Sequence, residues 1–257
     1  MARSRGIWMK TDFRKSSYNL KVRNQAKTLR AKPVTRDADI RNVLMASLKA
    51  KYSDKNNDLI VEEFGCKTAR ADVAVINGVL HAYEIKSDSD SLDRLPSQID
   101  AYQGVFEYVT LVCGHRLLER ARIEVPKWWG LQKAELKNGT VAIREIRAPK
   151  PNPSQSPLAV AKMLWKTEAL AVLRKYGRKG ATSRCTADEV WNIVAAHIPV
   201  AELTNEVRQA IKARGGSGFA KLSVPDDGLC TIESTVPVNH SPDLSWLLSL
   251  QSQHLPH

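Results

Sequence analysis

The pair Asn77-Gly78 separates two apolar segments of strand length, residues 71–76 and 79–85. Asn-Gly is strongly favoured in tight turns because both residues tolerate a positive φ, so the two segments are expected to form an antiparallel hairpin. Side chains alternate between the faces of a strand, which places Glu84 and Lys86 on the same face. The hairpin therefore decides which polar side chains of this region can act together.

The length of the hairpin loop decides whether Asp72 joins Glu84. A two-residue loop would leave Asp72 and Glu84 on opposite faces of the sheet. A three-residue loop of residues 76–78, with a left-handed glycine in a bulge, would pair Val75 with Val79. Asp72 and Glu84 would then be diagonal neighbours on one face. A joint site at these carboxylates thus requires a register shift.

Two carboxylates beside an ammonium group form an arrangement suited to hydrolysis of phosphodiester bonds. Crowded carboxylates repel each other unless a cation neutralises them, and oxygen ligands favour Mg²⁺ or Mn²⁺. We expect Asp72, Glu84 and the Ile85 carbonyl to bind the metal, which would activate a water, and Lys86 to stabilise the scissile phosphate. The alternative is an ordinary surface hairpin, because the Glu-x-Lys triplet alone is common.

The net charge of +12 is concentrated at the start of the chain. Residues 1–32 hold ten Lys or Arg against one acidic residue, whereas residues 33–157 hold 18 basic and 17 acidic residues. We expect this basic N-terminal arm to neutralise phosphates of a nucleic acid. A solubilising leader without a partner is the alternative.

The apolar periodicity predicts an α/β fold for residues 33–148, with a helix, a three-strand meander, a second helix and a fourth strand in that order. Thr35 is expected to cap the first helix. A further hairpin is expected to turn at Asn138-Gly139. The expected segments are 36–52, 59–64, 71–76, 79–85, 91–106, 108–113, 115–123 and 133–147.

A proline-rich segment, residues 149–157, is the best candidate for a linker, since its four prolines remove hydrogen-bond donors. Beyond it, residues 158–234 are predicted to form a mainly helical accessory domain. Its three helices and final hairpin are typical either of a winged-helix module or of a helical cap on the core. The expected helices are 158–176, 187–197 and 201–214, the hairpin strands are 219–224 and 229–233, and the tail is 235–257.

The arrangement of Asp72 and Glu84-Ile85-Lys86 resembles the PD-(D/E)xK nuclease superfamily. There, a restriction-endonuclease-like core carries an Asp on its second strand and a (D/E)xK triplet on its third. Gln98 and Tyr102 are similar to the Q-x-x-x-Y helix motif of the RecB-like branch. Residues 36–214 also resemble a family of standalone bacterial and phage proteins of this fold. The resemblance implies that Gln98 and Tyr102 position substrate or water; Tyr102 as a core aromatic is the alternative.

Other charged residues near the motif are weaker candidates. Glu63 is expected to be a third acid of the site, with Glu62 as the alternative if the strand register differs. Arg70 and Arg94 flank the motif and are candidates for contacts with backbone phosphates. A basic segment further along the chain supplies the remaining candidates for nucleic-acid binding: Arg174, Lys175, Arg178 and Lys179.

Together these features predict a Mg²⁺- or Mn²⁺-dependent nuclease that hydrolyses DNA. A non-catalytic nucleic-acid-binding protein with the same fold, and an RNA-directed nuclease, are the alternatives. We expect a cytoplasmic protein without a membrane partner, because no apolar run is long enough to span a bilayer. The four cysteines are not spaced as a zinc site. A homodimer is expected if duplex cutting uses two active sites.

Overall fold

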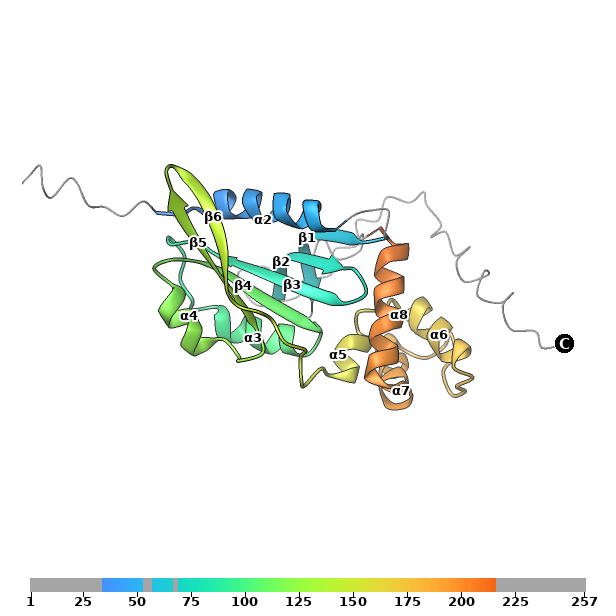
Figure 1. Ribbon diagram of the computed structural model, residues 1–257. Coiled ribbons are helices and arrows are strands. Elements are labelled where there is room, and N and C mark those ends of the chain that lie inside the picture. Colours follow the sequence, from blue (N-terminus) through green and yellow to red (C-terminus); the bar gives the residue numbers. More distant parts are fainter. Residues whose placement is uncertain (1–33, 53–56, 67–68, 216–257) are drawn as a thin grey trace, which may run out of the picture. The chain divides into compact units, whose positions relative to one another are not determined.

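The computed structural model describes residues 34–52, 57–66 and 69–215, which belong to one compact unit. Within these residues the fold is α/β: a mixed six-stranded sheet in the order β1 to β6, with seven helices (Figure 1). The strands are β1 (Leu59–Cys66), β2 (Ala69–Ile76), β3 (Leu80–Lys86), β4 (Tyr108–Gly114), β5 (Gly130–Lys137) and β6 (Thr140–Arg147). The helices are α2 (Asp37–Lys51), α3 (Leu95–Gln103), α4 (Leu118–Glu124), α5 (Pro157–Ala161), α6 (Lys166–Lys175), α7 (Ala187–His197) and α8 (Val200–Ala213).

Strand β3 is central to the sheet and is buried along its whole length. It pairs antiparallel with β2 and parallel with β4, and the crossover between β3 and β4 carries α3. A strand with helices on both faces is buried on both faces, so the polar side chains His81, Glu84 and Lys86 of β3 are buried together with its apolar ones. The predicted order of helix, three strands, helix and strand corresponds to α2, β1, β2, β3, α3 and β4.

Helices cover both faces of the sheet (Figure 1). On one face, the buried side chains of α2 (Ile40, Leu44 and Leu48) pack against the β2 and β3 residues Val73, Val75, Tyr83 and Ile85. On the other face, Tyr102 and Phe106 pack in a larger cluster that extends into α5, α7 and α8. The two faces of β3 thus contact two different sets of helices.

The hairpin between β2 and β3 forms, with a register two residues away from the predicted one. Ile76 pairs with Leu80, and Val75 pairs with His81 rather than with Val79. The loop is therefore 77–79, with Gly78 at φ 104°. Because the shift is an even number of residues, the side chains of the paired β2 residues, Val73–Ile76, alternate as predicted; Asp72 lies beyond the last pair.

The predicted linker, residues 149–157, is hydrogen-bonded to the loop that follows α3. The side chain of Asn152 donates to the carbonyls of Gln103 and Phe106, and the Ser156 amide donates to Gly104 O. Helices α5 to α8 share the apolar cluster of the sheet. The hairpin expected over residues 133–147 also forms and turns at Asn138-Gly139, but its first strand, β5, already begins at Gly130.

Two local predictions were wrong. Thr35 does not cap α2: the N-cap is Arg36, and the buried Thr35 hydroxyl donates to Asp88 Oδ2 at 2.9 Å. The single helix expected over 158–176 is two helices, α5 and α6. The break comes at Trp165, which is extended and whose amide donates to Glu168 Oε2, so a new helix starts there.

Several predicted segments lie outside the described residues: the basic arm 1–32, the hairpin strands 219–224 and 229–233, and the tail 235–257. In the part of the chain that is described, no helix is long and apolar enough to cross a membrane.

Candidate functional site

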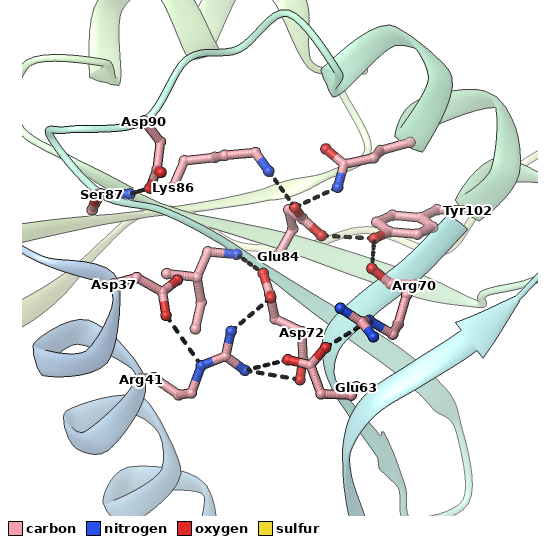
Figure 2. Close-up of polar contacts among 12 residues, drawn as sticks. Asp37, Arg41, Glu63, Arg70, Asp72, Glu84, Lys86, Ser87, Asp90 and Tyr102 are labelled. Atoms are coloured by element: carbon pink, nitrogen blue, oxygen red, sulfur yellow. Dashed lines mark hydrogen bonds and ion pairs between the residues drawn. The ribbon is translucent and has the colours of Figure 1, made fainter. Parts of the chain in front are cut away.

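Glu84 on β3 is the centre of a cluster of polar side chains (Figure 2). Its Oε1 accepts hydrogen bonds from Lys86 Nζ at 2.5 Å and from Gln98 Nε2 at 2.6 Å. Its Oε2 accepts from the Tyr102 hydroxyl, also at 2.6 Å. Helix α3 positions these last two residues one turn apart, so they meet the same carboxylate. The structure thus brings four of the predicted site residues together.

Burial makes the Glu84 carboxylate a poor place for an uncompensated negative charge. Glu84 is 2% exposed, and burial, followed by the charge of Asp72, raises its pKa above the usual value although Lys86 and Tyr102 counteract this. Burial and the neighbouring Glu84 likewise raise the pKa of Tyr102, so Tyr102 is a neutral donor. The site therefore favours an additional positive charge near Glu84 and Asp72.

Asp72 lies at a break in the sheet. The β1–β2 ladder pairs Glu62 with Val73 and Phe64 with Ala71, but skips Glu63 and Asp72 between them. Glu63 has a φ of 55°, in the left-handed region that is rare for residues other than glycine. The Asp72 carboxylate turns towards β3, where its Oδ2 accepts from the Ile85 amide at 2.7 Å.

Beyond the break, the side chains of β2 change faces. Val73 packs in the cluster beneath α2, whereas Ala71, two residues earlier, packs in the cluster with Tyr102. Regular alternation would put both on the same face. Asp72 is the residue where this change occurs, which explains how it reaches both Ile85 of β3 and a side chain of α2.

That side chain is Arg41, which was not among the site residues predicted from the sequence. Its Nη2 donates to Asp72 Oδ1 at 2.7 Å and its Nη1 to the Asp72 carbonyl at 3.2 Å. Nη1 is also 3.3 Å from Glu63 Oε1, and Nε contacts Asp37 one turn earlier on α2. The available signal was only the Asp37–Arg41 spacing of four residues, which is common on exposed helices.

Glu63, the predicted third acid, binds two arginines. Its Oε1 faces Arg41, and its Oε2 is 2.6 Å from Arg70 Nε. Arg70 in turn lies beside the cluster, because the Tyr102 hydroxyl contacts the Arg70 carbonyl at 2.8 Å. Glu63 and Arg70 therefore belong to the edge of the site, whereas the alternative acid, Glu62, is exposed.

The side chains of the remaining predicted nucleic-acid-binding residues make no described hydrogen bond or ion pair with this cluster, although Arg94 lies one turn before Gln98. Arg94 is exposed at the N-cap of α3. The others are exposed at the C-terminal end of α6 and in the turn after it: Arg174, Lys175, Arg178 and Lys179.

The donor atoms of the site fit a hard divalent cation. Asp72 and Glu84 offer carboxylate oxygens, and the buried Gln98 Oε1 accepts no hydrogen bond from any described residue. No group of three or more His, Cys, Asp or Glu side chains in the described residues could hold a metal. Mg²⁺ is commonly bound by one or two carboxylates and keeps several waters, so two carboxylates suffice for that ion.

A profile of the bacteriophage P4 protein cII family matches residues 12–220, which include every element described above. The chain belongs to the bacteriophage P4 protein cII family. One curated relative is protein cII of Enterobacteria phage P4, 31% identical over 121 residues. That match spans 47% of this chain and 45% of the P4 protein.

Among solved structures, a protein of unknown function from Silicibacter pomeroyi is similar to this cII family member. The two are 19% identical, with 54% of this chain and 94% of that chain covered, and the TM-score is 0.30.

Proposed function

We propose that the protein is a divalent-metal-dependent nuclease that hydrolyses phosphodiester bonds in DNA, with Asp72 and Glu84 as metal ligands. One observation carries the proposal: the break at Asp72 turns its carboxylate towards β3, beside a buried Glu84 that is bound to Lys86. The pKa of Glu84 is raised in part by the charge of Asp72, so the carboxylates interact. The order of α2, β1, β2, β3, α3 and β4 supports a PD-(D/E)xK core.

Each residue of the cluster has a role in this proposal. A bound cation would neutralise the carboxylates and promote ionisation of a water. Lys86 is buried, so its ammonium would stabilise charge on a phosphate oxygen more strongly than an exposed lysine would. Gln98 holds Glu84 with its amide and leaves Oε1 to accept a hydrogen bond from a water. Tyr102 fixes the other Glu84 oxygen.

DNA binding is assigned to cations outside the cluster. Within the cluster, four acids (Asp37, Glu63, Asp72 and Glu84) face three cations (Arg41, Arg70 and Lys86). Such a site attracts a metal ion more readily than a polyanion. Affinity for the backbone would therefore come from exposed arginines and lysines elsewhere, because phosphate contacts dominate nucleic-acid affinity.

Cleavage of labelled DNA by variants that remove single charges tests the proposal. We expect Asp72→Asn, Glu84→Gln and Lys86→Gln each to lower the Mn²⁺-dependent cleavage rate by about 100-fold or more, since each removes a charge at the reacting centre. DNA affinity in EDTA should stay at the wild-type level. Glu62→Gln is the matched control, because this exposed acid lies next to the site without belonging to the network.

Single-stranded DNA, duplex DNA and RNA should be compared with Mg²⁺, with Mn²⁺ and with EDTA. Cleavage of RNA but not of DNA would show that the substrate is RNA rather than DNA. Binding without cleavage of any substrate would favour a non-catalytic nucleic-acid-binding protein. Wild-type cleavage rates in Asp72→Asn or Lys86→Gln would show that the assigned residues do not perform the reaction.

A further inference from the structure

We propose that Arg41 is a positioning residue, which holds the Asp72 carboxylate in the orientation needed for metal binding. This inference rests on the proposed function. It concerns a residue of α2 that touches neither Glu84 nor Lys86 in the described structure. Three features support it: the break at Glu63 and Asp72, the fork of contacts made by Arg41, and the partial burial of the Arg41 side chain.

The break leaves Asp72 without the support of the strand ladder. Neither Asp72 nor Glu63 is paired between β1 and β2, and the last pair between β2 and β3 is Val73 with Tyr83. The carboxylate of Asp72 is therefore fixed only by its own contacts. One of these is the Ile85 amide, at Oδ2. The other oxygen, Oδ1, depends on Arg41.

Arg41 contacts both residues of the break at once (Figure 2). One terminal nitrogen binds the Asp72 side chain, and the other lies near the Asp72 carbonyl and Glu63 Oε1. The planar guanidinium makes such a fork with fixed geometry, which the single ammonium of lysine cannot reproduce. Asp37 holds the third nitrogen, Nε, so the side chain is anchored from α2.

The environment of Arg41 keeps it charged and in place. Its side chain is 19% exposed, and although burial opposes the charge, the ion pairs with Asp72 and Asp37 raise its pKa above the ordinary value. Each Asp72 oxygen has a single described hydrogen bond, and a carboxylate oxygen has two acceptor positions. A metal ligand can thus be held by Arg41 and still bind a cation.

The test is the Mn²⁺ affinity of full-length Arg41→Gln and Arg41→Lys, measured by calorimetry without DNA. Residues that orient a metal ligand typically contribute 10- to 100-fold to metal affinity, so we expect the dissociation constant to rise by about that factor in both variants. The Mn²⁺ concentration for half-maximal cleavage should rise in parallel. DNA affinity in EDTA should stay unchanged. Arg36→Gln, which removes an exposed arginine at the N-cap of α2, should behave as wild type.

Three outcomes would overturn the inference. Wild-type Mn²⁺ affinity in both Arg41 variants would show that Asp72 needs no such support. Wild-type affinity in Arg41→Lys alone would show that only the charge matters, not the fork. Loss of DNA affinity in EDTA together with metal affinity, in both variants, would show a general structural role. If wild-type protein with a cooperative melting transition neither binds Mn²⁺ nor cleaves DNA, the proposed function itself fails, which is a distinct result.

Discussion

His81 and Glu84, both on β3, show how burial of one strand acts on single ionisable side chains. Burial, helped by the charge of Lys51, lowers the pKa of His81 to about 3, whereas burial raises the pKa of Glu84. In each case burial disfavours the charged form. His81 is satisfied as a neutral ring, with Nε2 bonded to Thr110 Oγ1 at 2.9 Å and the ring stacked on Tyr83. The buried carboxylate of Glu84 is instead stabilised by hydrogen bonds from the donors of the site.

The lowered pKa of His81 predicts acid sensitivity of the fold. The unfolded chain binds a proton at His81 below its ordinary pKa of 6.5, whereas the folded chain does so only near 3. This part of the stability is therefore present above pH 6.5 and is lost as the pH falls towards 3. Between pH 7 and 5, we expect the wild type to lose about 2 kcal/mol more unfolding free energy than His81→Asn. Urea denaturation at both pH values measures the difference.

The two proteins are compared by how much their unfolding free energy changes with pH. Their unfolding free energies at a single pH differ for another reason, because His81→Asn also loses the stacking on Tyr83. If the unfolding free energies of the two proteins changed equally with pH, His81 would not be a buried neutral histidine.

The segment after β6 helps to hold the helix that carries Gln98 and Tyr102. The side-chain amide of Asn152 donates to Gln103 O at 2.7 Å and to Phe106 O at 2.8 Å, at the C-terminal end of α3. The Asn152 backbone amide also bonds to Glu107 O. A proline-rich segment predicted as a linker is thus anchored to the core at the end of a site helix.

Asn152→Ala should destabilise the protein, because it leaves two carbonyls at the end of α3 without their donor. We expect a loss of about 1 to 3 kcal/mol in unfolding free energy, measured by urea denaturation. Ser154→Ala is the control, since its hydroxyl makes only a 3.5 Å contact with Asn152. Equal stability of Asn152→Ala and wild type would mean that water replaces the lost amide.

Helix positions were predictable where local signals agree. Helix α7 covers the predicted residues 187–197 because Thr186 and Glu189 form a capping box at its start. Helices α5 and α6 were predicted as one, since the apolar period continues across the break. The contact that separates them, from the Trp165 amide to Glu168, is local but competes with helix continuation. Periodicity alone does not resolve such a competition.

The positive charge of the described residues is concentrated in one turn. Residues 174–184, from the end of α6 to the start of α7, contain five basic residues and no acid. Lys175 pairs with Glu206. Arg174, Arg178 and Lys179 are exposed, so their charges are available to phosphates. Because the cluster around Glu84 holds more acids than cations and so attracts a polyanion little, we propose that this basic turn contributes to the DNA binding that the proposed function requires.

Replacing Arg174, Arg178 and Lys179 together by glutamine should weaken DNA binding and reduce its salt dependence. Each lost phosphate contact changes the slope of log affinity against log salt by about 0.9 in duplex DNA, so the slope should fall by about 2 to 3. This slope is measured by fluorescence anisotropy of labelled DNA in EDTA at several salt concentrations.

Cleavage at saturating DNA should be retained in this triple variant, because the basic turn lies outside the acidic cluster. A second triple variant, Lys49→Gln with Arg144→Gln and Lys150→Gln, makes the same change in net charge at other exposed positions. If both triple variants shift the slope equally, net charge rather than the basic turn governs binding.

Local sequence patterns were enough to predict the hairpin at Asn77-Gly78, the shared face of Glu84 and Lys86, and the helical pairing of Gln98 with Tyr102. These follow from backbone geometry over a few residues. The position of Asp72 at a break opposite Glu63, and its contact with Arg41, 31 residues away, became visible only in the folded chain. Such contacts join separate elements, and their geometry depends on how a helix packs across the sheet, which local pattern does not encode.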